Sequence, residues 1–201
     1  MKKLRIAVIQ AIDYKKCREV VDKLKTEHFD LIMLCGGLGQ CLDVLRVGRS
    51  VYGIVDVDDD IHIVKTMKNV GAYIAGSLHF IDDGICISGI DAKNPIQNIE
   101  RLREKILANC FLTIILSHYP LKTSSCSKVK LLGKDLNIGI KNIFGNANKP
   151  AKLLFISCNK SFQSNLCIDV LDPSNVLVST NKQFTSLLVD VQDLSITVLG
   201  E

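Results

Sequence analysis

Aromatic side chains are scarce in this chain. Trp is absent, and aromatic residues make up only 5% of the 201 residues, so Ile, Leu and Val must build the core. The hydrophobic fraction of 47% and the charged fraction of 23% are ordinary for a globular protein. A chain of this length can bury about two-thirds of its unfolded surface. We find no internal repeat and no linker, so the sequence predicts a single domain over residues 1–201 with an aliphatic core.

Long apolar runs and clusters of one charge are also missing. No stretch approaches the roughly 18 apolar residues that a transmembrane helix needs. The net charge is +4, and the lysines are spread along the chain instead of forming a patch. The sequence therefore predicts no membrane span, and it gives no clear signal for nucleic-acid binding.

The eight cysteines form no CxxC pair and show no metal-ligand spacing. Several lie inside apolar runs, as at residues 33–35 and 85–87. This pattern favours reduced cysteines that act as small buried hydrophobes in a cytoplasmic protein. A composition rich in Lys and Ile and poor in Gln and Trp suits an archaeal or thermophilic source.

Short apolar runs bounded by polar turns predict buried strands at residues 4–9, 31–35, 51–55 and 111–116. Helical spacing predicts helices at residues 16–25, 41–47, 60–69, 94–106 and 137–144, and residues 82–84 predict a hairpin turn. Extended runs dominate the last third of the chain. The mixture predicts an α/β protein with two sheets packed face to face and helices outside them.

Five of the strand-like runs end in short polar or glycine-containing stretches. These read Gln-Ala-Ile-Asp at 10–13, Gly-Gly at 36–37, Asp-Val-Asp-Asp-Asp at 56–60, Ser-His-Tyr-Pro at 117–120 and Ser-Cys-Asn-Lys at 157–160. Their order and spacing resemble the calcineurin-like metallophosphoesterases. In that family the stretches read Asp-x-His, Gly-Asp, Gly-Asn-x-Asp, a lone His and Gly-His-x-His, and together they hold two metal ions. The resemblance runs from residue 4 to about residue 199 and implies a four-layer α/β/β/α sandwich of the metallo-dependent phosphatase type.

Only one ligand position implied by the resemblance keeps its ligand type, and that residue is His118. The other six positions are substituted, by Ala11, Asp13, Gly37, Val57, Cys158 and Lys160. Gly37 carries the most weight, because the family's carboxylate at this position bridges the two metal ions. Asp58, beside Val57, completes the set of degenerate-site positions. The sequence therefore predicts no metal site and no catalytic residues.

Three functions stay open at this level. The leading prediction is a catalytically inactive protein on a metallophosphoesterase fold, acting as a binding or scaffold subunit for a protein partner and needing no cofactor. The alternative is a residual metal-dependent phosphoesterase with Mn²⁺ or Mg²⁺ at a weak single site, whose ligands would be Asp13, His118 and either Asp58 or Asp59. The third is a ligand sensor in which Lys160 and His118 hold a nucleotide or phosphate.

Overall fold

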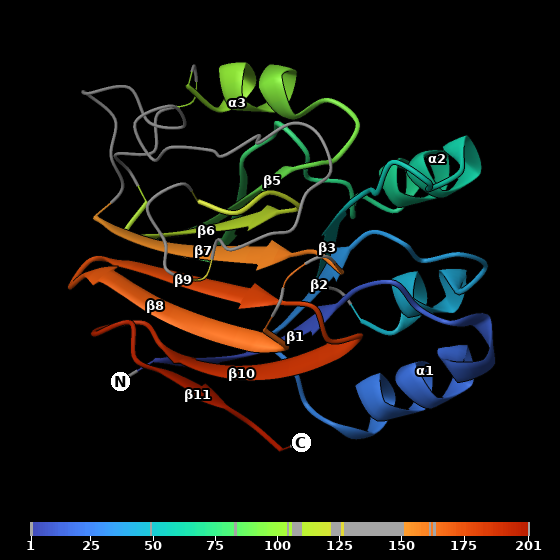
Figure 1. Ribbon diagram of the computed structural model, residues 1–201, viewed down its shortest axis with the longest axis horizontal. Helices are drawn as coiled ribbons and strands as arrows, with labels where there is room; N and C mark the ends of the chain where they lie inside the picture. Colours follow the sequence, from blue (N-terminus) through green and yellow to red (C-terminus); the bar gives the residue numbers. More distant parts are fainter. Residues whose placement is uncertain are drawn as a thin grey trace.

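The chain is an α/β protein with two mixed β-sheets and few helices (Figure 1). The computed structural model describes residues 2–48, 50–82, 84–103, 105, 110–121, 126, 151–160, 162 and 164–200. Within these residues the strands form one five-stranded and one six-stranded sheet, and both contain parallel and antiparallel pairs.

The five-stranded sheet has the order β11-β10-β1-β2-β3. Its members are β1 (Lys3–Ile9), β2 (Leu31–Cys35), β3 (Val51–Ile54), β10 (Phe184–Asp190) and β11 (Ile196–Val198). Strands β1, β2 and β3 are parallel, whereas β10 runs antiparallel to both β1 and β11. All five residues of β2 are buried, because both faces of this strand are covered.

The six-stranded sheet has the order β4-β5-β6-β7-β9-β8. Its members are β4 (His79–Asp82), β5 (Ile85–Ile90), β6 (Leu112–Ser117), β7 (Lys152–Cys158), β8 (Leu166–Asp172) and β9 (Asn175–Thr180). The four central strands are parallel, and β4 and β8 are antiparallel edge strands. The four strands predicted from apolar runs are confirmed as β1, β2, β3 and β6. The predicted turn joins β4 to β5, although Asp83 lies outside the described residues.

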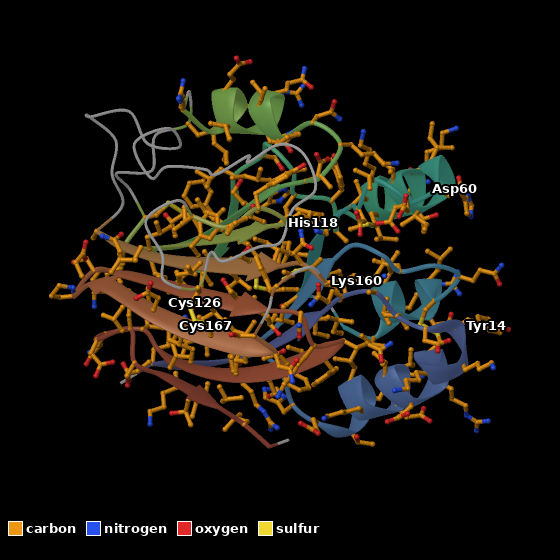
Figure 2. All side chains as sticks on the ribbon, viewed as in Figure 1. Tyr14, Asp60, His118, Cys126, Lys160 and Cys167 are labelled. Carbon is orange, nitrogen blue, oxygen red and sulfur yellow. A yellow bond between two sulfur atoms is a disulfide. The ribbon has the colours of Figure 1, made fainter. Side chains whose placement is uncertain are left out.

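All eight cysteines are paired, so the prediction of reduced cysteines was wrong. The disulfides are Cys17–Cys41, Cys35–Cys158, Cys86–Cys110 and Cys126–Cys167, the last of which is labelled in Figure 2. Partners are 24 to 123 residues apart in the sequence, and the fold brings their Cα atoms to 5.5–6.1 Å. Cys35 and Cys86 lie buried in apolar strands, as predicted, but neighbouring elements place the sulfurs of each pair opposite one another, which residue spacing does not reveal.

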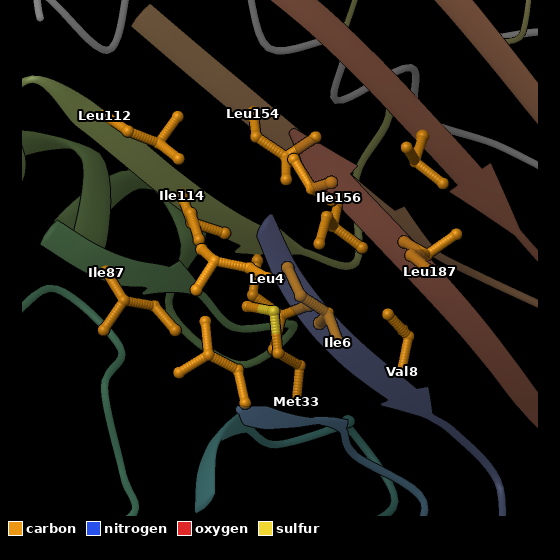
Figure 3. Packing of buried hydrophobic residues seen from close by; sticks show 14 of the residues in the cluster. Leu4, Ile6, Val8, Met33, Ile87, Leu112, Ile114, Leu154, Ile156 and Leu187 are labelled. Carbon is orange, nitrogen blue, oxygen red and sulfur yellow. The ribbon is translucent and has the colours of Figure 1, made fainter. Parts of the chain in front are cut away.

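The main core lies between the two sheets and is almost entirely aliphatic. Alternate residues of β1 (Leu4, Ile6 and Val8) face this core, and Figure 3 shows them near Met33 and opposite Ile114 of the other sheet. The Cys35–Cys158 disulfide also crosses this core, from β2 to β7. The alternation follows from the two-residue period of a strand, which sends successive side chains to opposite faces.

Helices cover the outer faces of both sheets. On the five-stranded sheet, Ala7 and Ile9 pack with α1 (Cys17–Thr26) and α2 (Ile61–Asn69). On the six-stranded sheet, Phe155 packs in one cluster with Leu102 of α3 (Pro95–Arg103). Residues 41–47, predicted as a helix, contain the 3₁₀ helix η2 (Leu42–Arg46), and the predicted helix at 137–144 lies outside the described residues. No helix in the described part of the chain is long and apolar enough to cross a membrane.

Gly89 allows β5 to approach β3 closely, because a Cβ atom there would overlap Cγ2 of Ile54 in β3. Gly53 of β3 is crowded within its own sheet, since a Cβ atom there would lie 2.8 Å from Cβ of Leu34 in β2. Single bridges link Gly53 to Tyr73 and Ala75 to Gly89, so the short segment after α2 runs between the two sheets.

Candidate functional site

A cavity of about 310 Å³ lies where strands of both sheets end. Each wall comes from a different strand end: Gln10 and Ala11 after β1, Cys35 and Gly36 at β2, Asp56, Val57 and Asp58 after β3, Ala92 after β5, His118 and Tyr119 after β6, and Asn159 and Lys160 after β7. Figure 2 shows His118 and Lys160 from neighbouring strands on this side of the molecule. Ligand sites in α/β proteins commonly lie outside the carboxyl ends of strands.

Five of the eight positions predicted from sequence line this cavity, namely Ala11, Val57, Asp58, His118 and Lys160. Gly37 and Cys158 lie directly behind lining residues. A Cβ atom at Gly37 would lie 2.9 Å from Cα of Ala11, and Cys158 is bonded to Cys35. Asp13 is not among the lining residues: its exposed carboxylate accepts a hydrogen bond from the backbone N–H of Lys15 and caps the 3₁₀ helix η1 (Tyr14–Lys16).

The backbone around Ala11 is held in an unusual conformation. Ala11 has a φ of 50°, a left-handed conformation that L-residues other than glycine seldom adopt. The N–H groups of Ala11 and Ile12 donate to the carbonyls of Gly36 and Gly37, at 3.0 and 2.9 Å. These two hydrogen bonds join the end of β1 to the Gly-Gly turn. Strain of this kind is typical of functional sites.

Asp59 joins two backbone segments of the site, a role that the sequence did not reveal. Its carboxylate is buried and accepts backbone hydrogen bonds from Gly37 at 2.9 Å, Leu38 at 3.2 Å and Asp56 at 2.7 Å. It thereby ties the turn after β2 to the end of β3. The neighbouring Asp60 caps α2 by accepting the N–H of His62. Of the three consecutive aspartates, Asp58 alone lines the cavity, whereas Asp59 serves the backbone.

His118 presents an unsatisfied ring nitrogen. The side chain is buried, and its Nδ1 lies 3.2 Å from the carbonyl oxygen of Cys158. A carbonyl only accepts, so Nδ1 carries the proton and, in the neutral ring, Nε2 carries the lone pair. Nε2 is buried and has no hydrogen-bond partner. This nitrogen is also inaccessible, so no group in the cavity can contact it unless the surrounding atoms move.

Burial lowers the pKa of His118 below the ordinary histidine value, although the negative charges of Asp56, Asp59 and Asp91 act in the opposite direction. The imidazole is therefore neutral at pH 7. Burial likewise raises the pKa of Tyr119, whose hydroxyl donates to the carbonyl of Ala92 at 3.1 Å. Both rings are uncharged, so the formal charge of the cavity comes from its other ionisable groups.

Among the residues that the structure describes, the charged groups that line the cavity are two carboxylates and one ammonium. Asp56 is half-buried, and its Oδ1 accepts the N–H of Val57 at 2.6 Å. Asp58 and Lys160 are exposed. With His118 neutral, one negative charge is left in excess. Sequence reasoning picked out Asp58 and Lys160 but missed Asp56, because a glycine position of the resembled motif falls on it.

The donor set of a two-metal centre is not assembled here. Among the residues that the structure describes, no three His, Cys, Asp or Glu side chains are grouped so that they could hold a metal ion. The sulfur of Cys158 is taken up by a disulfide, the carboxylate of Asp59 by three backbone N–H groups, and that of Asp13 by a helix cap. The residues present therefore do not fit a binuclear metal centre.

Comparisons with known proteins bear on the fold alone. No family model and no curated protein matches the chain. Among solved structures, it is similar to the protein TT1561 of Thermus thermophilus, with a TM-score of 0.57, 12% identity and 98% of each chain covered. A second solved structure has a TM-score of 0.62 with 7% identity, again over 98% of both chains. The fold thus recurs over 98% of the length of proteins that share little sequence with this one.

Proposed function

We propose that this chain is a non-catalytic binding protein built on a metallophosphoesterase-type frame, a four-layer α/β/β/α sandwich. Helices on the outer face of each sheet support the layer order. The gathering of five of the eight positions predicted from sequence around one cavity supports the family resemblance. In this proposal the protein acts as a binding or scaffold subunit for a protein partner, and it does not hydrolyse phosphate esters.

The backbone at Gly37 carries the proposal. Two divalent cations about 4 Å apart repel strongly, and a bridging carboxylate is what makes such a pair stable. Gly37, at the position of that bridge, has a φ of +65°, and a Cβ atom there would be 2.9 Å from Cα of Ala11. The site therefore lacks the bridge and also the space for one. Ala11 and Val57 offer no donor, and Lys160 adds a positive charge where the family has a neutral imidazole.

A cytoplasmic location is part of the proposal. Four disulfides in a cytoplasmic protein bear on the kind of organism from which it comes. Disulfides are rare in the cytosol of mesophiles, whereas intracellular proteins of hyperthermophilic archaea and bacteria are rich in them. We therefore propose a thermophilic prokaryotic source.

A residual phosphoesterase with one weakly bound Mn²⁺ or Mg²⁺ is the second candidate, and His118 favours it. Metal-binding histidines usually donate their other ring N–H to a carbonyl or carboxylate, as Nδ1 of His118 does to Cys158. Of the carboxylates considered for such a site, however, only Asp58 lines the cavity with His118. Two ligands hold a divalent ion weakly, which leaves this candidate behind the binding protein.

The test combines metal analysis of the purified protein with Mn²⁺-dependent hydrolysis of p-nitrophenyl phosphate. We expect no bound metal in stoichiometric amount, and the same background rate for the wild type and for His118→Ala. Turnover that saturates with Mn²⁺ and disappears in His118→Ala would reject the binding protein in favour of the single-metal enzyme.

A further inference from the structure

The Cys17–Cys41 disulfide has one end near solvent. Cys17 is partly exposed and lines an open cleft of about 780 Å³ beside α1, whereas Cys41 is only 1% exposed. Tyr14, labelled in Figure 2, lines the same cleft. This cleft shares no lining residue with the cavity at the strand ends. The bond therefore joins a partly exposed residue on one side to a core residue on the other.

Two of the other disulfides are closed to solvent. Their four sulfurs belong to residues that are at most 1% exposed, namely Cys35, Cys158, Cys86 and Cys110. Thiol–disulfide exchange begins when a thiolate attacks one sulfur of the bond, so access to that sulfur limits the reaction. These two bonds cannot exchange while the fold stays closed.

The Cys126–Cys167 disulfide is the nearest rival, because Cys167 is also partly exposed. The two-residue period of β8 places Asp169, a carboxylate, next to Cys167 on the same face of the strand. In contrast, the residues on either side of Cys17 in the sequence are the cations Lys16 and Arg18. An anionic thiolate should therefore approach Cys17 more readily than Cys167.

We propose that the Cys17–Cys41 disulfide is a site of reversible thiol–disulfide exchange, in which an external anionic thiol of the glutathione type forms a mixed disulfide with Cys17. Lys15, Arg18 and Lys25 line the cleft and offer cations to the carboxylates of such a thiol. The two carboxylates in the lining, Asp22 and Asp43, each lie 3.8 Å from an arginine. The inference goes beyond the proposed function and does not depend on it.

The exchange has two steps. In the first, the external thiolate attacks Sγ of Cys17: a new bond forms between these sulfurs, the bond to Cys41 breaks, and Cys41 leaves as a thiolate that takes up the proton lost by the external thiol. In the second, another thiolate attacks the external sulfur of the mixed disulfide and releases Cys17. In total two thiols are oxidised to one disulfide, and the Cys17–Cys41 pair gains two electrons and two protons.

The disulfide also connects two backbone segments behind the strand-end cavity. Cys17 follows the segment that contains Ala11, and Cys41 follows the Gly-Gly turn, where its N–H group donates to the carbonyl of Leu38 at 2.9 Å. Reduction removes the covalent link between these segments but leaves the hydrogen bonds from Ala11 and its neighbour to the turn. We therefore expect the amide protons of Gly37 and Leu38 to exchange with solvent several-fold faster in the reduced protein.

The experiment exposes the intact, oxidised protein to reduced glutathione, blocks free thiols with N-ethylmaleimide at intervals, and maps both labels by peptide mass spectrometry. We expect glutathione on Cys17 and N-ethylmaleimide on Cys41 to appear first, at least about tenfold faster than any label on another cysteine. Protein unfolded in guanidinium is the comparison. There the four pairs should react at similar rates, because the fold no longer shields them.

Charge variants test the preference for an anionic thiol. Lys15→Gln/Arg18→Gln should slow exchange with glutathione about threefold at low ionic strength. It should leave exchange with cysteamine unchanged, because the thiolate form of cysteamine carries no net charge. Lys65→Gln, an exposed change on α2, is the matched control and should react as the wild type does. Equal slowing with both thiols would overturn the preference for an anionic thiol.

Three results would overturn the exchange site itself. They are labels on Cys167 before Cys17, glutathione on Cys41 instead of Cys17, and labelling of all eight cysteines together, which would mean that exchange requires global unfolding. Unchanged amide exchange at Gly37 and Leu38 after reduction would overturn the connection between the disulfide and the backbone behind the strand-end cavity.

Discussion

At the scale of single residues, Gly37 is the position where backbone conformation and crowding act together. We expect Gly37→Ala to lower the free energy of unfolding by about 2 kcal/mol or more, since the new methyl group meets Cα of Ala11 at 2.9 Å in a left-handed conformation. Urea denaturation measures the change.

Gly71→Ala separates the two causes. Gly71 has a similar φ of +72°, but no atom lies within 4 Å of a Cβ there. Only the backbone penalty of about 1 kcal/mol should remain. Equal losses for the two variants would show that crowding against Ala11 contributes nothing.

His118 should make stability depend on pH in a defined direction. Because burial holds its folded pKa below the ordinary value of 6.5, the unfolded chain binds a proton more readily than the folded one. The free energy of unfolding should therefore fall as the pH drops below 6.5, and His118 should have little effect above it. His79, whose pKa burial also lowers, acts in the same direction and stays in every variant below.

Urea denaturation at pH 7.5 and 5.5 tests this. The loss of stability on acidification should be smaller in His118→Gln than in the wild type by about 1 kcal/mol. His62→Gln, an exposed change on α2, should behave as the wild type does. A His118→Gln protein with the wild-type pH dependence would mean that the imidazole titrates normally.

The sequence indicated much of the cavity at this scale, because it lies at strand ends that residue order marks. Ala11, Val57, Asp58, His118 and Lys160 were named, and all five line it. The sequence does not show which of the three consecutive aspartates binds the backbone. Only the structure shows that Asp59 accepts hydrogen bonds from three N–H groups. The residue type alanine does not predict the left-handed φ of Ala11.

At the scale of elements, the buried strands were the clearest signal. The run at 31–35 coincides with β2, because a strand covered on both faces is apolar throughout and a turn ends it. Residues 41–47 were harder, since a short apolar segment near Cys41 satisfies both α and 3₁₀ spacing. Pairing order, such as β9 lying between β7 and β8, depends on contacts that no local pattern contains.

The approach of β3 to β5 gives a prediction for this scale. We expect Gly89→Ala to cost about 2 kcal/mol or more, because its methyl group would overlap Ile54 inside a close-packed region. Gly48→Ala is the comparison, as the nearest atom, Cδ1 of Ile32, would be 4.0 Å away, and its effect should stay within about 0.5 kcal/mol. A mild Gly89→Ala would indicate that the two strands can separate slightly without loss.

At the scale of the whole molecule, the disulfides differ in how much chain they close. Cys35 and Cys158 are 123 residues apart and join the two sheets, whereas Cys17 and Cys41 are 24 apart. The chain-entropy relation gives about 5 kcal/mol for the longer loop and about 3.5 kcal/mol for the shorter. The double variant Cys35→Ala/Cys158→Ala should therefore lose more stability than Cys17→Ala/Cys41→Ala.

Guanidinium denaturation of both double variants, without reductant, makes the comparison. If the Cys17–Cys41 disulfide proved the more stabilising, these bonds would act mainly through something other than the entropy of the unfolded chain. The sequence indicated the burial of Cys35, but the partner of each cysteine is a property of the assembled fold.

The hydrogen bonds between the end of β1 and the Gly-Gly turn also limit what protein engineering can achieve with this scaffold. A library that seeks hydrolytic activity by single substitutions would sample an aspartate at position 37 and find it destabilising, since its Cβ atom would meet Cα of Ala11 at 2.9 Å. Both segments would have to be rebuilt together, with residues inserted or deleted between them. Under the proposed function, a return to two-metal chemistry would therefore require a change in the main chain as well as in the side chains.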